Sequence, residues 1–287
     1  MSIEPTFPPQ RPSPAERAAA RILRDQHRLA AIRRRQRFLN ALPWLIILCF
    51  LLLWQIFVRV LGIAEFVLPA PTVIAASMVK WWEPLMTNAG MTLMTTSIGF
   101  TFAIVVGLLA GIAFGSSTII YRGVYPLLIA FNSVPKVALV PVLVLWFGIN
   151  AVPAIITAFV ISVFPIVVNV ATGIATIEPE QRDVLRALGA RQRDIMLKVG
   201  LPRAMPYFFA SLKIAITVAF VGSITAETVA SESGIGHLMI VAASRFDVPL
   251  VFAGLIVTAI MGVAMYAIAA IIENHTTKWA TRGRDNF

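Results

Sequence analysis

Long apolar segments alternate with short polar ones between residues 41 and 272. An α-helix needs about 20 apolar residues to cross the hydrocarbon core of a bilayer, and each segment has roughly that length. The segments are 41–60, 89–114, 125–147, 152–174, 204–224 and 250–272. This pattern predicts an all-α, polytopic membrane protein with six transmembrane helices.

The stretch between the first two apolar segments has a different character. Residues 72–82 have the length of a short helix and end in the paired tryptophans Trp81 and Trp82. Amphipathic aromatic rings favour the boundary between lipid and water. We therefore expect an interfacial helix here, lying at the outer membrane surface.

The second apolar segment carries glycines at intervals of four: Gly107, Gly111 and Gly115. Small residues at this spacing let two helix backbones approach closely. The sequence predicts such a contact and leaves open whether it forms within one chain or between two copies.

Residues 177–202, IEPEQRDVLRALGARQRDIMLKVGLP, form the longest polar interruption between two apolar segments. Pro179 suits a first helical turn and Gly189 suits the position just past a helix end, so a short helix is expected between them. A second short helix is expected over 192–199, closed by Gly200 and Pro202.

Apolar residues recur through the first of these helices at helical spacing. They fall on one face and comprise Val184, Leu185 and Leu188, with Arg182 and Arg186 on the flanks. An exposed apolar stripe on a short helix between two membrane spans needs a cover. A docking partner in the cytosol is the natural one.

Composition agrees with a membrane protein, since 58% of the residues are hydrophobic and 13% are charged. Soluble domains contain about a quarter charged residues. The net charge of +10 does not indicate nucleic-acid binding, because the basic residues lie between spans and at the termini rather than on a folded basic domain. Cys49 is the one cysteine, which excludes an intrachain disulfide.

The residue types that catalysis requires are scattered. The histidines His27, His237 and His275 lie in three separate regions, and neither H-E-x-x-H nor C-x-x-C occurs. No lysine follows a glycine, so the phosphate-binding G-x-x-x-x-G-K-[ST] loop is missing too. We expect no catalytic or metal-binding residues, and any ATP-driven work must come from another subunit.

The distribution of positive charge predicts the orientation. Of the 24 lysines and arginines, 19 lie in the N-terminal tail, around Arg122, in residues 177–203 or after the last span. Positive residues stay on the cytosolic side, so both termini are expected there. The expected parts are an arginine-rich tail over 1–40, which lies on anionic lipid headgroups, a six-span domain over 41–274, and a C-terminal tail over 275–287.

A few polar residues fall in or beside the spans, where they are costly and commonly functional. The candidates for lining a translocation path are Asn132, Lys136, Asn169 and Glu227. Lys136 either attracts an anionic substrate, lies beside an aqueous vestibule or pairs with Glu227. The two asparagines either hydrogen-bond between helices or line the path. Glu227 is a gate element, an ion-pair partner or an exposed outer residue.

The loop over 177–203 resembles the EAA loop of permease subunits from bacterial ABC importers. Its pattern is E-A-A, three residues, G, nine residues, I, one residue, L-P. Here Asp183, Val184 and Leu185 stand in the first three places, followed by Gly189, Val199, Leu201 and Pro202. The opening triplet and the isoleucine are replaced, whereas the glycine and the Leu-Pro pair match.

Three further stretches look like permeases of the nitrate/sulfonate/taurine type: PKVALVPVLVLWFG (135–148), FPIVVN (164–169) and AETVASESGIGHLM (226–239). That group also includes importers of pyrimidine vitamin precursors, riboflavin and aromatic acids. The resemblance covers most of residues 60–272.

The resemblance implies a bacterial inner-membrane complex. Two permease copies pair, two cytosolic ATP-binding subunits supply ATP and Mg²⁺, and a periplasmic or surface-tethered protein delivers the substrate; this chain holds no cofactor. The residues implied in coupling to the ATPase are Glu180, Arg182, Asp183, Val184, Leu185, Arg186, Leu188, Gly189, Leu201 and Pro202.

The expected function is therefore that of a permease subunit of an ABC importer, for a small anion such as sulfonate, taurine or nitrate. An aromatic acid or a pyrimidine or riboflavin vitamin precursor is the alternative substrate. The alternative classes are an autonomous secondary carrier or channel, for which we find no clear internal repeat, and a membrane scaffold, which leaves the charge of Lys136 unexplained.

Overall fold

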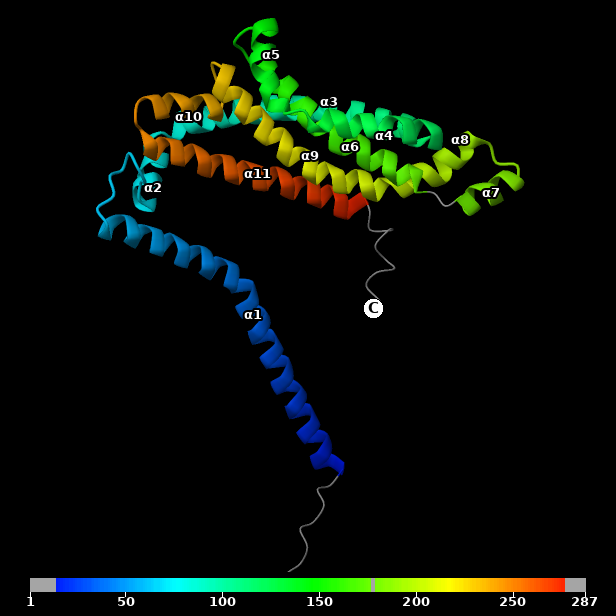
Figure 1. Ribbon diagram of the computed structural model, residues 1–287. Coiled ribbons are helices and arrows are strands. Elements are labelled where there is room, and N and C mark those ends of the chain that lie inside the picture. The colour runs from blue at the N-terminus through cyan, green and yellow to red at the C-terminus, as the bar shows by residue number, and fades with distance from the viewer. Residues whose placement is uncertain (1–13, 177–178, 277–287) are drawn as a thin grey trace, which may run out of the picture. The chain divides into compact units, whose positions relative to one another are not determined.

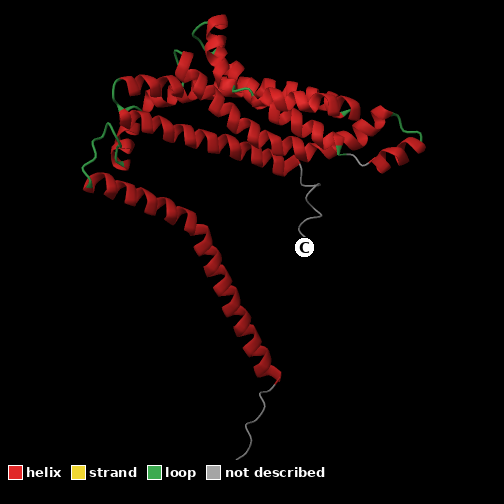
Figure 2. Ribbon diagram, in the orientation of Figure 1, coloured by secondary structure: helices red, strands yellow, loops and turns green. Residues whose placement is uncertain are grey.

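The computed structural model describes residues 14–176 and 179–276; residues 1–13, 177–178 and 277–287, which include the ends of both expected tails, lie outside the described residues. The described elements are helices joined by loops and turns (Figure 2). The predicted all-α class is confirmed.

The chain divides into two compact units, and the boundary between them in the sequence lies after Gly62. In the first unit, α1 (Pro14–Val60) is a single helix of 47 residues. Its part Phe38–Val60 has a mean hydropathy of 2.4 and is long enough to cross a bilayer, as predicted for the first span. Pro43 removes a backbone donor inside α1, which is a common cause of kinks, and Figure 1 shows α1 bent part-way along.

Four long helices build the second unit: α3 (Trp82–Gly115), α6 (Val152–Ala175), α9 (Leu201–Ala230) and α11 (Val248–Thr276). The central helix α6 packs against α3 on one side and α9 on the other, and α11 packs along α9 (Figure 1). Ile166, Val170 and Ile174 of α6 are fully buried in this core. Within the described residues, five helices are long and apolar enough to cross a membrane, and six are if one bent pair counts as a span.

The glycine stripe of α3 lies directly on α6. A Cβ at Gly107 would approach Ile166 Cβ to 2.8 Å, and one at Gly111 would approach Val170 Cβ to 2.6 Å. These distances are too short for a side chain, so the glycines let the two helix backbones come close together. The contact that the sequence left open is therefore made within one chain.

The third predicted span is not one straight helix. It consists of α4 (Thr118–Ser133), the 3₁₀ turn η1 (Lys136–Leu139) and α5 (Val140–Phe147), and its two halves are bent by 71°. The break falls at Val134, whose backbone is extended because the following Pro135 disfavours the helical conformation. Pro126 lies inside α4 without ending it, and Pro141 occupies the first turn of α5, where a proline is tolerated.

Two short helices flank the ends of the long ones. The helix predicted over 72–82 is α2 (Pro71–Lys80), which contacts α11; its position at the membrane surface stays a prediction. Helix α10 (Ile235–Ser244) packs on α3, α9 and α11. The sequence suggested that the fifth span ends near residue 224 and that Glu227 follows it. In the structure α9 extends to Ala230, so Glu227 lies inside this helix.

The polar loop forms α7 (Pro179–Ala187), α8 (Gln192–Ile195) and η2 (Met196–Gly200). The second helix was expected to close at Gly200 and Pro202, and this expectation is wrong. The Leu201 N–H donates to the Met196 carbonyl, so η2 is a π-helical turn that leads directly into α9. Pro202 occupies the first turn of α9 and does not interrupt the chain of helices from Gln192 to Val229.

Candidate functional site

Helix α7 presents apolar side chains to solvent at the end of the long helices. Val184 is 59% exposed and Leu188 is 79% exposed, four residues apart on one face. Leu185, on the same helix, is half-buried. We call Val184, Leu185 and Leu188 the α7 apolar strip.

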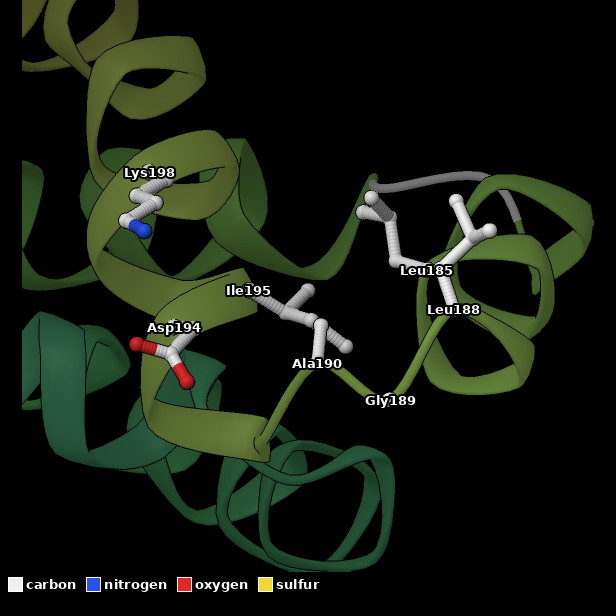
Figure 3. A pocket seen from close by; sticks show the side chains of 7 residues that line it. All are labelled: Leu185, Leu188, Gly189, Ala190, Asp194, Ile195 and Lys198. Carbon is white, nitrogen blue, oxygen red and sulfur yellow. The ribbon is translucent and has the colours of Figure 1, made fainter.

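A shallow groove of about 300 Å³ lies beside the strip, between α7 and the helices that follow. Figure 3 shows its lining, with Leu185 and Leu188 on α7, and Ile195 and Lys198 across the Gly189 turn. A second groove, of about 390 Å³, runs along the other edge of the strip and is lined by Glu180, Gln181, Val184, Leu185 and Val199. The strip therefore lies between two open grooves.

Gly189 makes the turn that ends α7. Its φ is +83°, a conformation that glycine adopts readily and other residues adopt at a cost. Its N–H donates to the Arg186 carbonyl at 2.9 Å, and the Ala190 N–H donates to the Leu185 carbonyl at 3.0 Å. This pair of bonds is the Schellman arrangement of a helix C-terminus. The expected role of Gly189 as a sharp turn is confirmed.

Polar side chains tie the loop to the long helices. The Arg203 guanidinium at the start of α9 donates to Gln181 Oε1 at 3.2 Å, and the Gln192 amide donates to the Ser116 carbonyl beyond α3 at 3.4 Å. Arg186 donates to Gln192 Oε1 at 3.1 Å. These hydrogen bonds connect α7 and the turn after it to the beginning of α9 and the end of α3.

The remaining residues predicted for coupling lie around the strip. Glu180, Asp183 and Arg186 are exposed, and Arg182 is half-buried, as are Leu201 and Pro202 in the first turn of α9. The exposed charges surround the apolar side chains, an arrangement typical of a protein-docking surface with an apolar centre and a polar rim.

The structure does not bring the four predicted path residues together. Lys136 Nζ donates to Asn132 Oδ1 at 2.6 Å and lies 5.5 Å from the centre of the Phe164 ring, beside the break between α4 and α5. Asn169 donates to the Pro165 carbonyl of its own helix at 2.8 Å, and its amide forms no hydrogen bond to another helix in the described part of the chain.

Glu227 is 2% exposed, which excludes the interpretation as an exposed outer residue. Its carboxyl accepts hydrogen bonds from the hydroxyls of Thr92 and Thr95 on α3 and from the N–H of Gly236 at α10. The ammonium of Lys136 is bonded to Asn132 and the carboxyl of Glu227 to α3 and α10, and the described residues show no ion pair between Lys136 and Glu227.

Sequence reasoning missed an ion pair between two of the long helices. Lys213 Nζ on α9 lies 2.6 Å from Glu273 Oε2 on α11. The side chains are 25% and 20% exposed, so the pair is largely shielded from solvent. Lys213 is the one charged residue in the apolar segment 204–224, and this isolation was the signal that could have revealed it.

Replacing Lys213 by methionine is expected to lower the stability of the folded protein by about 2 kcal/mol, because the ion pair between Lys213 and Glu273 is lost at a partly buried site. For a domain of this size the melting temperature in detergent should fall by about 4–8 °C. Lys213→Met combined with Glu273→Leu should recover most of the loss, and Lys198→Met, at an exposed lysine, should change little. A double variant no more stable than Lys213→Met would show that the pair is not what joins α9 and α11.

Residues 103–278 match the family described as "Binding-protein-dependent transport system inner membrane component". The chain belongs to this family. The permease is thus the non-catalytic, multi-pass inner-membrane subunit of an ABC importer, which associates with separate ATPase subunits and itself carries no cofactor.

Relatives of the permease differ in what they carry. It is 29% identical to the formylaminopyrimidine transport permease protein ThiX of Halalkalibacterium halodurans, over 83% of this chain and 95% of the relative. It is 30% identical to the nitrate import permease protein NrtB of Synechococcus elongatus, over 69% of this chain and 75% of the relative. Among solved structures, the inward-facing methionine ABC transporter MetNI shares the fold, with a TM-score of 0.60, 20% identity and coverage of 68% of this chain and 97% of that chain.

Proposed function

We propose that this permease forms the path for a small anion of the nitrate or sulfonate class. In this proposal two copies of the chain pair, a periplasmic or surface-tethered protein delivers the anion, and the α7 apolar strip docks on the cytosolic ATPase. The observation that carries the proposal is the exposed strip itself, on a loop that continues without interruption into α9.

The surface of α7 supports the proposed docking role. Val184 and Leu188 are more than half exposed although both are apolar, and open grooves lie on each side of them. An exposed apolar centre with a charged rim is the composition of a protein interface. The separate ATPase is the partner that an importer must contact to use ATP.

The proposed orientation places α7 and both termini in the cytosol. The loop 177–203 and the arginine-rich tail hold most of the positive charge, and positive loops remain on the cytosolic side of the membrane. The opposite end of the bundle, with α2 and α10, then faces the protein that delivers the substrate.

The preference for an anion rests on Lys136. Its ammonium lies at the break between α4 and α5, where it donates to Asn132 and lies over the Phe164 ring, and within residues 14–176 and 179–276 it forms no ion pair with a carboxylate. A cation in that position attracts anions. The similarity to ThiX supports a formylaminopyrimidine as the other candidate substrate. We rank it second because a largely neutral ring would not need the positive charge of Lys136.

The substrate is tested by uptake into proteoliposomes that contain the permease with its ATPase and binding protein. We expect ATP-dependent uptake of labelled nitrate or taurine, and a fall of at least about tenfold for Lys136→Gln, equivalent to about 1.4 kcal/mol in the transport barrier. Arg59→Gln, which removes a positive charge at an exposed position of α1 outside both the path and the α7 grooves, is the matched control. Uptake of a pyrimidine precursor that Lys136→Gln leaves unchanged would instead establish the second candidate.

A further inference from the structure

The buried carboxyl of Glu227 joins three helices. Thr92 Oγ1 donates to Glu227 Oε2 at 2.7 Å, Thr95 Oγ1 donates to Oε1 at 3.2 Å, and the Gly236 N–H donates to Oε2 at 3.1 Å. The threonines belong to α3, Glu227 to α9 and Gly236 to α10. A buried carboxyl that accepts three hydrogen bonds holds all three helices at fixed separations.

The same part of α3 also holds the start of α10 directly. Thr92 Oγ1 accepts from the Ile235 N–H at 2.8 Å while it donates to Glu227, and Asn88 Oδ1 accepts from the Gly234 N–H at 2.8 Å. The first backbone donors of α10, which have no partner within their own helix, are thereby satisfied by α3 and Glu227. We call Asn88, Thr92, Thr95, Glu227 and the turn 234–236 the Glu227 cluster.

The turn in the Glu227 cluster is built for close approach. Gly234 has a φ of +102°, and a Cβ there would overlap the Glu227 carboxyl. A Cβ at Gly236 would overlap the Ile224 carbonyl of α9. Only glycine at both positions lets the backbone of the turn reach the carboxyl.

Glu227 lies near the end of α9 that is opposite to the loop 177–203, which contains α7. Helix α9 begins at Leu201, directly after η2, and Glu227 follows 26 residues later in the same helix. At 1.5 Å per residue this is about 39 Å, which exceeds the thickness of the hydrocarbon core. One unbroken helix therefore connects the α7 loop to the Glu227 cluster.

We infer that Glu227 is a positioning residue for transport: it fastens the far end of α9 to α3 and α10, so that a displacement imposed on the α7 loop moves the helices at the opposite membrane face together. This inference rests on the proposed docking of α7 on the ATPase. The carboxyl acts as an acceptor of hydrogen bonds and not as a carrier of charge.

The inference is tested in the permease–ATPase complex by measuring solute transported for each ATP hydrolysed. Glutamine can accept from Thr92 and Gly236 through its amide oxygen and donate to Thr95, whereas aspartate is one methylene too short. We expect Glu227→Gln to keep at least half of the coupling ratio, and Glu227→Asp and Glu227→Ala to lower it at least tenfold while the rate of ATP hydrolysis stays within twofold. Retention by Asp with loss by Gln would show that the charge matters, and would overturn the inference.

Matched controls lie close by. Glu232 is exposed on the following turn, so Glu232→Ala should leave the ratio unchanged. Thr92→Val removes a hydroxyl of the Glu227 cluster and should reproduce Glu227→Ala, whereas Thr96→Val removes a buried hydroxyl that has no hydrogen-bond partner among the described residues and should be silent. If Glu227→Ala does not assemble with the ATPase, the comparison of the two threonine variants decides.

Different results would contradict the docking of α7 on the ATPase and the positioning role of Glu227. If the wild-type permease does not bind the ATPase through α7, the proposed docking fails. If binding is normal and Glu227→Ala or Thr92→Val transports with the wild-type ratio, the inference about Glu227 alone is wrong. A loss of folded complex without a change in the ratio would also contradict it, because a purely structural role predicts that result.

Discussion

Replacing Leu188 by aspartate is expected to reduce binding of the ATPase subunit to the permease at least about a hundredfold, and transport with it. Leu188 is 79% exposed at the end of the α7 apolar strip. If the strip enters a cleft of the ATPase, an aspartate there must be buried without a partner, which costs several kcal/mol. Binding is measured by co-purification of the ATPase with the membrane-inserted permease, and transport by uptake into proteoliposomes.

The control for this experiment is Ala187→Asp, which adds the same charge to the same helix but outside the strip. Its effect should be at most a few-fold. Both variants should reach the membrane and melt at the wild-type temperature, because neither position lies in the packed core. Normal binding of the ATPase to Leu188→Asp would show that α7 is not the docking element.

Replacing Gly111 by leucine is expected to prevent folding of most of the protein. A Cβ at Gly111 would lie 2.6 Å from Val170 Cβ and 3.1 Å from the Val167 carbonyl, both on the central helix α6. The helices α3 and α6 must separate to admit the side chain, which costs more than the about 1–3 kcal/mol of ordinary overpacking. The yield of monodisperse protein in detergent should fall at least fivefold.

Val106→Leu serves as the comparison for this variant. Val106 lies on α3 but is exposed, so a larger side chain there meets no neighbouring helix. Its yield and melting temperature should remain near the wild-type values. Gly111→Leu protein that folds with an unchanged melting temperature would mean that α3 and α6 do not pack through their glycines.

Much of the fold was accessible from the sequence because the bilayer imposes a length on every apolar helix. The glycine spacing indicated a close contact correctly, and the structure supplied the partner, α6. The bend at Val134 was harder to predict. Pro126 and Pro135 both lie in the same segment, yet only the second interrupts the helix, and which proline does so depends on the packing around it.

Some residues of the candidate site could also be predicted from local sequence, whereas others could not. The turn at Gly189 and the exposed Leu188 follow from local patterns, namely a glycine after a helix and an apolar residue among charges. The partners of Glu227 could not be predicted, because Thr92 lies 135 residues away and the contact exists only once α3 and α9 are packed. Lys213 and Glu273 meet for the same reason.

The bend between α4 and α5 limits what can surround this side of the permease. Breaking a helix frees backbone carbonyl groups, and acyl chains offer them no hydrogen-bond donor. The Lys136 ammonium satisfies the Asn132 carbonyl at the break, and it carries a charge that lipid tails equally exclude. The annulus of lipid around the folded permease must therefore be interrupted at the bend, where water or another polypeptide takes its place.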